Sequence, residues 1–265
     1  MHVVVGIVAL FLVLAGTVLL GQSGSSFTGI VYAPALLLVG VGPFCVAVTS
    51  YRLEELLACL GSLRRALGFN AARSRLRLYE ELSRFAAAVR GRQAAQAHEI
   101  AESATHELIR QLAPLVLRRY SSEDIERTAT TAAFVQVSGL KRSEDVLTTL
   151  ARVAPATGLV GTVLGLINLL KDLQRFDQLG PSMALALLCT LYGLVLANAF
   201  FQPLARLIHS FAAVAMEESK LLTRALLLLT EEKPLADVRR LFESLGGAAA
   251  PEPAPAVSSA PGGGQ

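Results

Sequence analysis

Ionisable and aromatic side chains are both scarce in this sequence. Only 17% of its 265 residues are Asp, Glu, Lys or Arg, 6% are aromatic, and Trp is absent. Without Trp, anchoring at a membrane–water interface falls to Tyr, Lys and Arg. The three cysteines are too few and too far apart for a disulfide framework or a metal cluster. A net charge of +3 is too small for a nucleic-acid-binding surface, so we expect neither a bound metal nor a nucleic-acid partner.

Long apolar runs are what the chain has in abundance. Hydrophobic residues make up 53% of it, and its mean hydropathy is +0.51, above the range of soluble domains. Four stretches contain no Asp, Glu, Lys or Arg and are long enough to cross roughly 30 Å of hydrocarbon. They are Val3–Leu20, Thr28–Thr49, Val153–Leu170 and Ser182–Leu204.

The first stretch differs from a signal peptide in two respects. It lacks a basic region before the apolar run, and a second apolar stretch follows after the short turn Gly21–Phe27. A membrane hairpin fits this pattern better. We therefore predict an integral membrane protein with four transmembrane helices.

The distribution of Lys and Arg predicts the orientation of these spans. Most of the basic residues lie between the second and third spans or after the fourth, whereas the loop between spans three and four has only Lys171 and Arg175. Cytoplasmic loops carry the excess of positive charge. We expect a multi-pass protein of the bacterial inner membrane with both termini in the cytoplasm.

The segments outside the membrane show helical periodicity without strand-like alternation. We predict that the second span continues as a helix beyond residue 51. A long helical stretch should cover Arg77–Leu117, and Pro114 should kink or end it. Ser121 with Asp124 should cap a further helix. The fold class is therefore all-α. The expected domains are a hairpin (1–50), a cytoplasmic helical bundle (51–152), a second hairpin (153–204), C-terminal helices (205–245) and a disordered tail of Ala, Pro, Gly and Ser (246–265).

The four spans contain no Asp, Glu, Lys, Arg or His, and this limits what they can do alone. A proton or sodium path through a bilayer needs a charged group or a set of oxygen ligands. If the protein conducts ions, the charged carrier must come from another chain. Spans three and four are nevertheless rich in small and hydroxyl-bearing residues, and the glycines that allow close helix packing are Gly158, Gly161, Gly165 and Gly193.

Three motifs resemble the flagellar stator family of MotA and PomA, within the MotA/TolQ/ExbB superfamily. They are the run at 154–166 (APATGLVGTVLGL), the run at 179–193 (LGPSMALALLCTLYG), and Ala197-Asn198 followed by Pro203-Leu204-Ala205. The resemblance extends over nearly all of the chain before Gly246. Four spans with an internal amino terminus favour MotA, since TolQ and ExbB have three spans and an external one.

The resemblance implies a function and a set of partners. Five such subunits surround a dimer of a MotB-type partner, whose single membrane helix supplies an essential Asp. H⁺ or Na⁺ passes along that Asp beside spans three and four, and the cytoplasmic part drives the rotor switch protein of the flagellum, which serves motility and chemotaxis. The protein is then no enzyme, needs membrane lipid around it, and has no cofactor beyond the transported ion.

The same resemblance assigns roles to individual residues. Pro155 and Pro203 match the two functional prolines of the family and would act as hinges that couple the channel to the cytoplasmic part. Thr162 and Thr190 match the two threonines that face the partner's Asp. Cys189 replaces the family's first Thr of the Thr-Thr-Leu-Tyr-Gly run, so this position is less polar here.

The expected rotor contact is Arg90, Arg92 and Glu99, but the surrounding stretch departs from the family pattern, and a solvated helix face explains these charges as well. Two other functions therefore remain open. One is a TolQ- or ExbB-type energiser of a cell-envelope or gliding system; the other is a non-conducting membrane scaffold. The sequence also does not distinguish H⁺ from Na⁺.

Overall fold

The chain is helical throughout the part that the structure describes. The structure is a computed structural model that describes residues 32–171, 174, 176–231, 233 and 240. The predicted span Val3–Leu20 and the tail 246–265 lie outside these residues. The helices are α2 (Ala33–Ser50), α3 (Leu53–Gly68), α4 (Ala71–Arg90), α5 (Ala94–Ser103), α6 (Glu107–Leu117), α7 (Ser122–Lys171), α8 (Phe176–Val195), the π-helix η2 (Leu196–Phe201) and α9 (Gln202–Thr230). No strand occurs among the described residues, which confirms the predicted all-α class.

Two compact units divide the chain, and two long helices contribute to both. Unit 1 comprises Met1–Phe69 and Phe134–Met216, and unit 2 comprises Asn70–Ala133 and Glu217–Gln265. One of the three boundaries between them lies between α3 and α4, and the other two fall inside α7 and α9. Each unit has its own buried apolar cluster.

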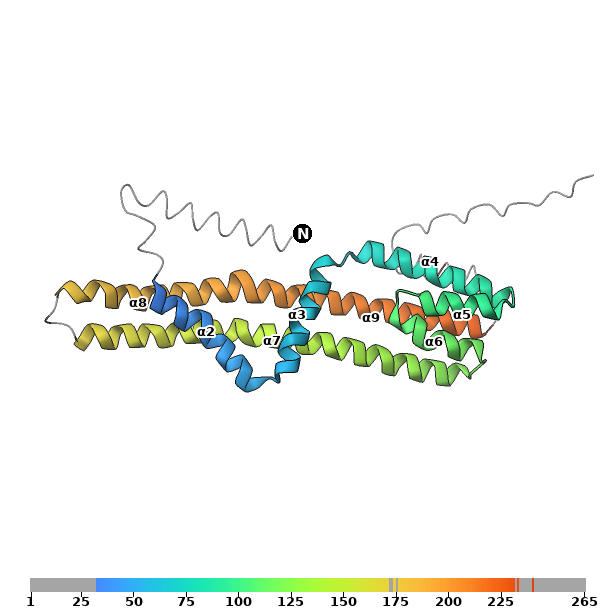
Figure 1. Cartoon of the computed structure of the whole chain (residues 1–265), viewed down its shortest axis with the longest axis horizontal. Coiled ribbons are helices and arrows are strands. Elements are labelled where there is room, and N and C mark those ends of the chain that lie inside the picture. Colours follow the sequence, from blue (N-terminus) through green and yellow to red (C-terminus); the bar gives the residue numbers. More distant parts are fainter. Residues whose placement is uncertain (1–31, 172–173, 175, 232, 234–239, 241–265) are drawn as a thin grey trace, which may run out of the picture. The chain divides into compact units, whose positions relative to one another are not determined.

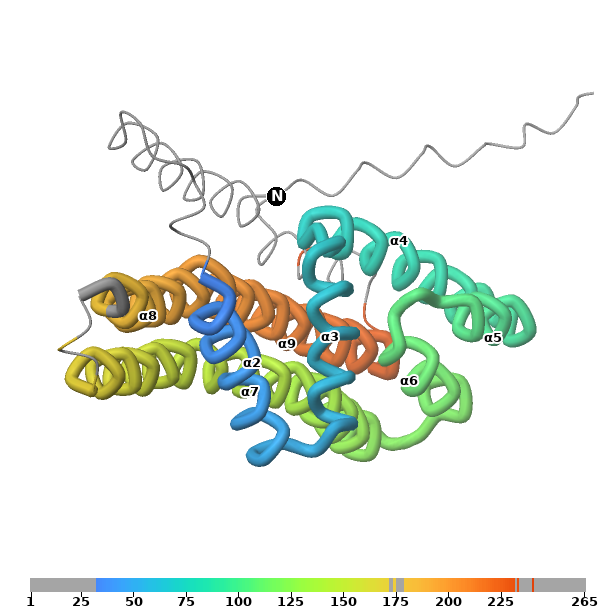
Figure 2. Tube along the Cα trace, turned by 60° about the vertical axis from the view of Figure 1, so that its left-hand side comes forward, coloured from blue at the N-terminus to red at the C-terminus, as the bar shows by residue number. Residues whose placement is uncertain are grey.

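Unit 1 contains the helices that are apolar enough to span a membrane. By length and composition these are Ala33–Ser50, part of Ser122–Lys171 and part of Leu179–Thr230. The described part of the second predicted span and all of the third and fourth fall on these helices. Within unit 1, α7 and α8 run side by side and α2 packs against α8 (Figures 1 and 2).

The predicted continuation of the second span is wrong, because the chain breaks between α2 and α3. Tyr51 and Arg52 have extended backbone angles, with ψ of 151° and 145°. The Arg52 N–H, at the start of α3, donates to Glu55 Oε2 at 3.3 Å. Helix α3 buries Cys59, Ser62 and Ala66 rather than its leucines, and the leucines that it leaves exposed are Leu53, Leu57, Leu60 and Leu67.

Unit 2 packs three short helices against one end of α7 and of α9. Its buried cluster joins Phe85 of α4, Ile109 of α6, Ile125 of α7 and Leu226 of α9, all fully buried. The predicted long helix over Arg77–Leu117 is therefore divided into α4, α5 and α6. Pro114 lies inside α6, which ends three residues later.

The division also separates three side chains that one continuous helix would place on one face. His98 and Glu102 belong to α5 and form a pair at 3.2 Å, whereas His106 is the N-cap of α6. Across the described residues no group of His, Cys, Asp and Glu could hold a metal ion.

The start of α7 agrees with its predicted cap. Ser121 Oγ accepts a hydrogen bond from the Asp124 N–H at 3.1 Å and donates to Asp124 Oδ2 at 2.6 Å. The first of these bonds satisfies one of the backbone donors that a helix start leaves free, and the second joins the two side chains. The predicted signal at Ser121 and Asp124 is thus confirmed.

Candidate functional site

The close contact of α7 with α8 is built on four glycines. A methyl group added at Gly158 would lie 2.7 Å from the Cys189 carbonyl oxygen, and one at Gly193 would lie 2.8 Å from the Ala154 carbonyl oxygen. At Gly165 it would lie 2.8 Å from the backbone nitrogen of Ala186. Such distances leave no room for a side chain, so the two backbones touch, as in small-residue packing of membrane helices. Gly161 meets the buried Cys189 side chain in the same seam.

The two threonines assigned to the ion pathway lie along this seam. Thr190 is half-buried, and its Cα lies 3.4 Å from the position of a methyl group at Gly158. Thr162 follows Gly158 by one turn of α7, and its hydroxyl donates to the Leu159 carbonyl at 2.6 Å. Its proton is therefore committed to the backbone, while its oxygen lone pairs stay available as acceptors.

The two prolines have different local surroundings. Pro155 lies inside α7, and its Cα would be 3.2 Å from a methyl group at Gly193. Pro203 follows η2, where the Gln202 N–H donates to the Ala197 carbonyl five residues back. Proline has no N–H of its own and crowds the preceding turn, and a wider turn accommodates both effects. The π-helix has no sequence signal other than this proline.

A cavity of ≈ 420 Å³ opens beside Pro203. Its polar side chains recur every four residues, and its lining consists of Asn198, Gln202, Pro203, Arg206, Leu207 and Ser210. Arg206 is the first charged residue after Asp177. The polar lining thus begins within the predicted fourth span and continues past its end.

The three residues of the expected rotor contact lie in unit 2. Arg90 ends α4 and Arg92 follows in the turn to α5; both line one cavity together with Arg119. Glu99 is exposed on α5 and does not line that cavity. The two arginines are therefore brought together, and Glu99 is not part of their group.

Sequence reasoning missed a buried carboxylate in unit 2. Glu218 on α9 is 3% exposed, and its Oε2 lies 3.9 Å from Nε2 of His106. Burial raises the pKa of Glu218, against a hydrogen bond from Ser74 and the charge of Arg75, which lower it. Burial likewise lowers the pKa of His106, although the charges of two nearby glutamates oppose this effect. Only an i, i+3 or i+4 pairing would have been visible from sequence, and this contact joins separate helices.

The fold and the seam together define a class: a polytopic helical membrane protein in which a glycine-packed helix pair carries hydroxyls but, over residues 153–170 and 182–204, no Asp, Glu, Lys, Arg or His. Comparison with known proteins agrees with this class. The profile of the MotA/TolQ/ExbB proton channel family matches residues 93–220. Motility protein A of Aquifex aeolicus is 29% identical over 209 residues, which is 76% of this chain and 79% of that protein.

Two solved stator complexes share the fold. The C. jejuni MotAB structure has a TM-score of 0.78 at 21% identity, and the match covers 92% of this chain and 95% of the solved chain. The flagellar MotAB stator complex from Bacillus subtilis has a TM-score of 0.76 at 20% identity, with coverage of 89% and 92%. The chain is thus similar to the MotA/TolQ/ExbB proton channel family over residues 93–220, and these findings together support a member of the MotA and PomA motility proteins. It is accordingly a protein of the inner membrane.

Proposed function

We infer that this chain is the channel-forming stator subunit of an ion-driven rotary motor that turns the flagellum, working with a MotB-type partner. The observation that carries this function is the α7–α8 seam: Thr162 and Thr190 lie along a closely packed helix pair in a region without any charge. Hydroxyl oxygens can ligate Na⁺ or order water for a proton, but they cannot supply the mobile charge. An acid from the partner completes the path.

Several finer features belong to the same proposal. Five copies surround two partner helices, each of which contributes an Asp; H⁺ or Na⁺ moves between that Asp and the seam. Pro155 and Pro203 act as hinges between the seam and the cytoplasmic helices, and Arg90, Arg92 and Glu99 meet the rotor switch protein. Both termini lie in the cytoplasm, in accord with the excess of Lys and Arg there.

Replacement of one hydroxyl tests the ion path. In a host that lacks its own stator subunit, co-expression of this chain with its partner should restore swimming. We expect Thr190→Ala to lower swimming speed at least about tenfold, because a lost charge-assisted hydrogen bond costs about 1.5–3 kcal/mol. Thr190→Ser keeps the hydroxyl and should retain most of the speed. Co-purification with the partner should be the same for both variants.

Thr49→Ala is the matched control, since the Thr49 hydroxyl only bonds back to the Val46 carbonyl on α2. It should swim like the parent. Normal swimming of Thr190→Ala would remove this threonine from the ion path. Failure of the parent chain to support swimming with any MotB-type partner would instead refute the stator function itself.

A further inference from the structure

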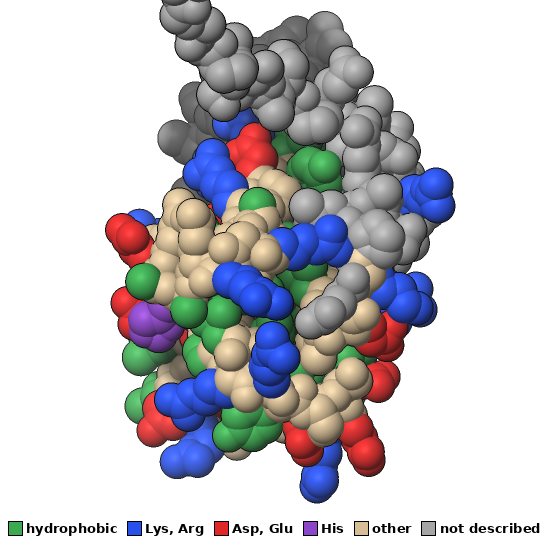
Figure 3. Space-filling model, turned by 90° about the vertical axis from the view of Figure 1, so that its right-hand side faces the viewer, with side chains coloured by type: hydrophobic (Ala, Val, Ile, Leu, Met, Phe, Trp, Pro, Cys, Tyr) green, Lys and Arg blue, Asp and Glu red, His purple; other side chains and the backbone are tan. Residues whose placement is uncertain are grey.

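A hollow lined by three arginines lies in unit 2, and we call it the arginine pocket. It has a volume of ≈ 450 Å³ and is lined by Val89, Arg90, Arg92, Val116, Arg119, Leu229 and Thr230. These residues come from the ends of α4, α6 and α9 and from the turns that follow α4 and α6. Figure 3 looks onto the end of unit 2 where these helices end, and Lys and Arg side chains gather in the middle of that face.

The positive charge of the arginine pocket is not neutralised within the described part of the chain. None of the described residues that line it is acidic. The ion pairs of the described residues involve other arginines, such as Arg75 with Glu217 and Arg110 with Glu107. Three guanidinium groups around one hollow therefore favour an anion, above all a phosphate, whose oxygens match their donor geometry.

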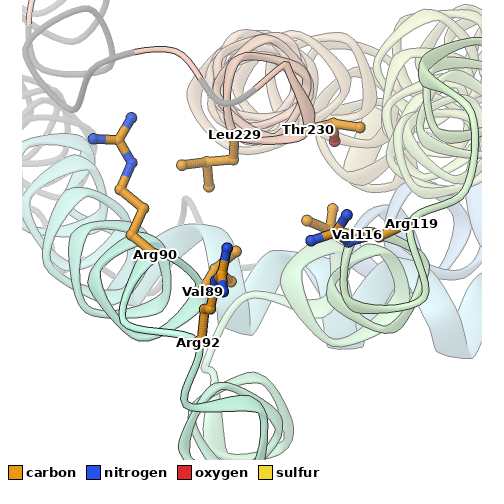
Figure 4. A pocket seen from close by; sticks show the side chains of 7 residues that line it. All are labelled: Val89, Arg90, Arg92, Val116, Arg119, Leu229 and Thr230. Atoms are coloured by element: carbon orange, nitrogen blue, oxygen red, sulfur yellow. The ribbon is translucent and has the colours of Figure 1, made fainter.

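Two of these arginines have a left-handed backbone. Arg92 and Arg119 both have φ of 55°, and they are the only residues other than glycine with positive φ in the described part of the chain. Each follows the end of a helix, and the next N–H, of Gln93 or of Tyr120, donates back to the Ala88 or the Leu115 carbonyl at 3.0 and 3.1 Å, which is a common way for a helix to end. Figure 4 shows Arg92 and Arg119 on different sides of the open space, with Leu229 and Thr230 along another side. The two helix endings thus place two arginine side chains on the border of the same cavity.

Volume and lining indicate the size of the occupant. Sites for small molecules usually measure about 300–1,000 Å³ and combine apolar walls with a few polar groups. At ≈ 450 Å³ the arginine pocket is far larger than a lone phosphate requires, and Val89, Val116 and Leu229 give it apolar walls. This combination suits a phosphate joined to a flat apolar ring.

Arginines near helix C-termini also have a simpler explanation, since they offset the partial negative charge of the free carbonyls. That effect favours Arg90 and Arg119 at the ends of α4 and α6. It does not require a hollow between them. The dipole and the helix endings therefore explain the positive charge and the left-handed backbone, but not the cavity that three guanidinium groups share.

We propose that the arginine pocket binds a phosphorylated small molecule of nucleotide size, with phosphate oxygens on Arg92 and Arg119 and the ring against Val89, Val116 and Leu229. Binding itself does not depend on the motor function. A consequence that does depend on it concerns the rotor: an occupied pocket would neutralise Arg90 and Arg92, which we assign to the rotor contact, so that ligand and rotor compete.

The proposal is tested by binding to the full-length chain, purified in detergent with its partner, without any assay of motility. The probes are ATP and inorganic pyrophosphate, titrated by calorimetry in magnesium-free buffer. We expect saturable binding of ATP. The double variant Arg92→Ala/Arg119→Ala should weaken it by about tenfold or more, because two charge-assisted hydrogen-bonding groups are lost.

Two further variants distinguish binding in the arginine pocket from non-specific electrostatic attraction of the anion to the protein surface. Arg84→Ala/Arg118→Ala removes the same charge from exposed positions of the same region that do not line the pocket, and should change the affinity less than twofold. Thr230→Phe fills the pocket without changing charge, and should weaken ATP more than pyrophosphate. Circular dichroism confirms that each variant keeps its helix content. Absence of saturable ATP binding to the parent, or equal losses in both double variants, would overturn the proposal.

Discussion

At the scale of single residues, the most unusual group is Glu218, because its carboxylate is buried. Its charge lies inside unit 2, near His106 on α6 and near Ser74 and Arg75 on α4. Arg75 is already held by Glu217 at 2.6 Å, and Glu81 and Glu107 are the other acids that act on His106. Three buried atoms there, Arg75 Nε, His106 Nδ1 and Glu218 Oε1, have no hydrogen-bond partner.

This arrangement predicts how stability depends on pH. The pKa of Glu218 is raised on folding, so the stability linked to it is present below the pKa of the unfolded chain and is lost as pH rises through the folded value. We expect Glu218→Gln to raise Tm at pH 8 by about 2–4 °C, the shift that a gain on the order of 1 kcal/mol gives in a chain of this size. The gain should shrink toward pH 5. Helix melting by circular dichroism between pH 5 and 8 measures it.

The neighbouring Glu217→Gln is the matched control. Its carboxylate is more exposed and pairs with Arg75, so its loss should not stabilise the chain at pH 8. His106 acts in the opposite direction. Its pKa is lowered on folding, so its contribution is present above the pKa of the unfolded chain and is lost as pH falls. An equal gain for Glu218→Gln at every pH would show that packing, and not charge, causes it.

At the scale of elements, the α7–α8 seam depends on contacts between backbones. A methyl group at Gly193 would meet the Ala154 carbonyl oxygen and the Cα of Pro155, neither of which can move as a flexible side chain would. We expect Gly193→Ala to force the helices apart beside Pro155 and to cost about 1–3 kcal/mol. Thermal unfolding in detergent checks the stability, and swimming speed should fall with it.

Gly139→Ala on α7 provides the comparison, because nothing lies within 4 Å of the added methyl group. Alanine favours a helix more than glycine does, so this variant should be as stable as the parent or slightly more stable. Equal Tm values for the two alanine variants would mean that the helices do not touch at Gly193.

The elements also show which parts of the fold the sequence could predict. Long charge-free stretches with glycines at spacings of three and four predicted α7 and α8, because span length and small-residue packing depend on local sequence. The breaks at Tyr51 and Ala104 were missed, since neither has a proline or glycine to announce it. The π-helix before Pro203 was missed as well. At the two breaks packing between helices decides the backbone, which periodicity within one helix does not show. The wider turn of the π-helix instead accommodates Pro203.

The residues of the candidate site likewise fall into those that the sequence could predict and those that only the fold reveals. Thr162 and Thr190 could be named from motifs, because their neighbours in the chain identify them. The arginine pocket could not be named as a whole. Arg90 and Arg92 are close in sequence, but Arg119 and Leu229 come from other helices, and only the fold brings them to one cavity.

At the scale of the whole molecule, the described spans and the predicted first span share one property: none contains Asp, Glu, Lys, Arg or His. Moving a bare cation through hydrocarbon is expensive, and a few hydroxyls do not offset that cost. The chain reconstituted alone in liposomes should therefore carry no H⁺ or Na⁺ current, whereas the complex with its partner should carry one. Dyes sensitive to pH and to sodium, each used in buffers that lack the other ion, identify the transported ion.

Replacement of the membrane Asp that we propose for the partner tests whether the two chains share one ion path. Changing that Asp to Asn leaves its size and removes its charge, so the current of the complex should fall to the level of the empty liposomes. Thr190→Ala should lower the same current while native mass spectrometry still finds five copies of this chain with two of the partner. A current through this chain alone would mean that its seam conducts without a carboxylate. A current that survives the loss of the Asp would place the ion path elsewhere in the complex.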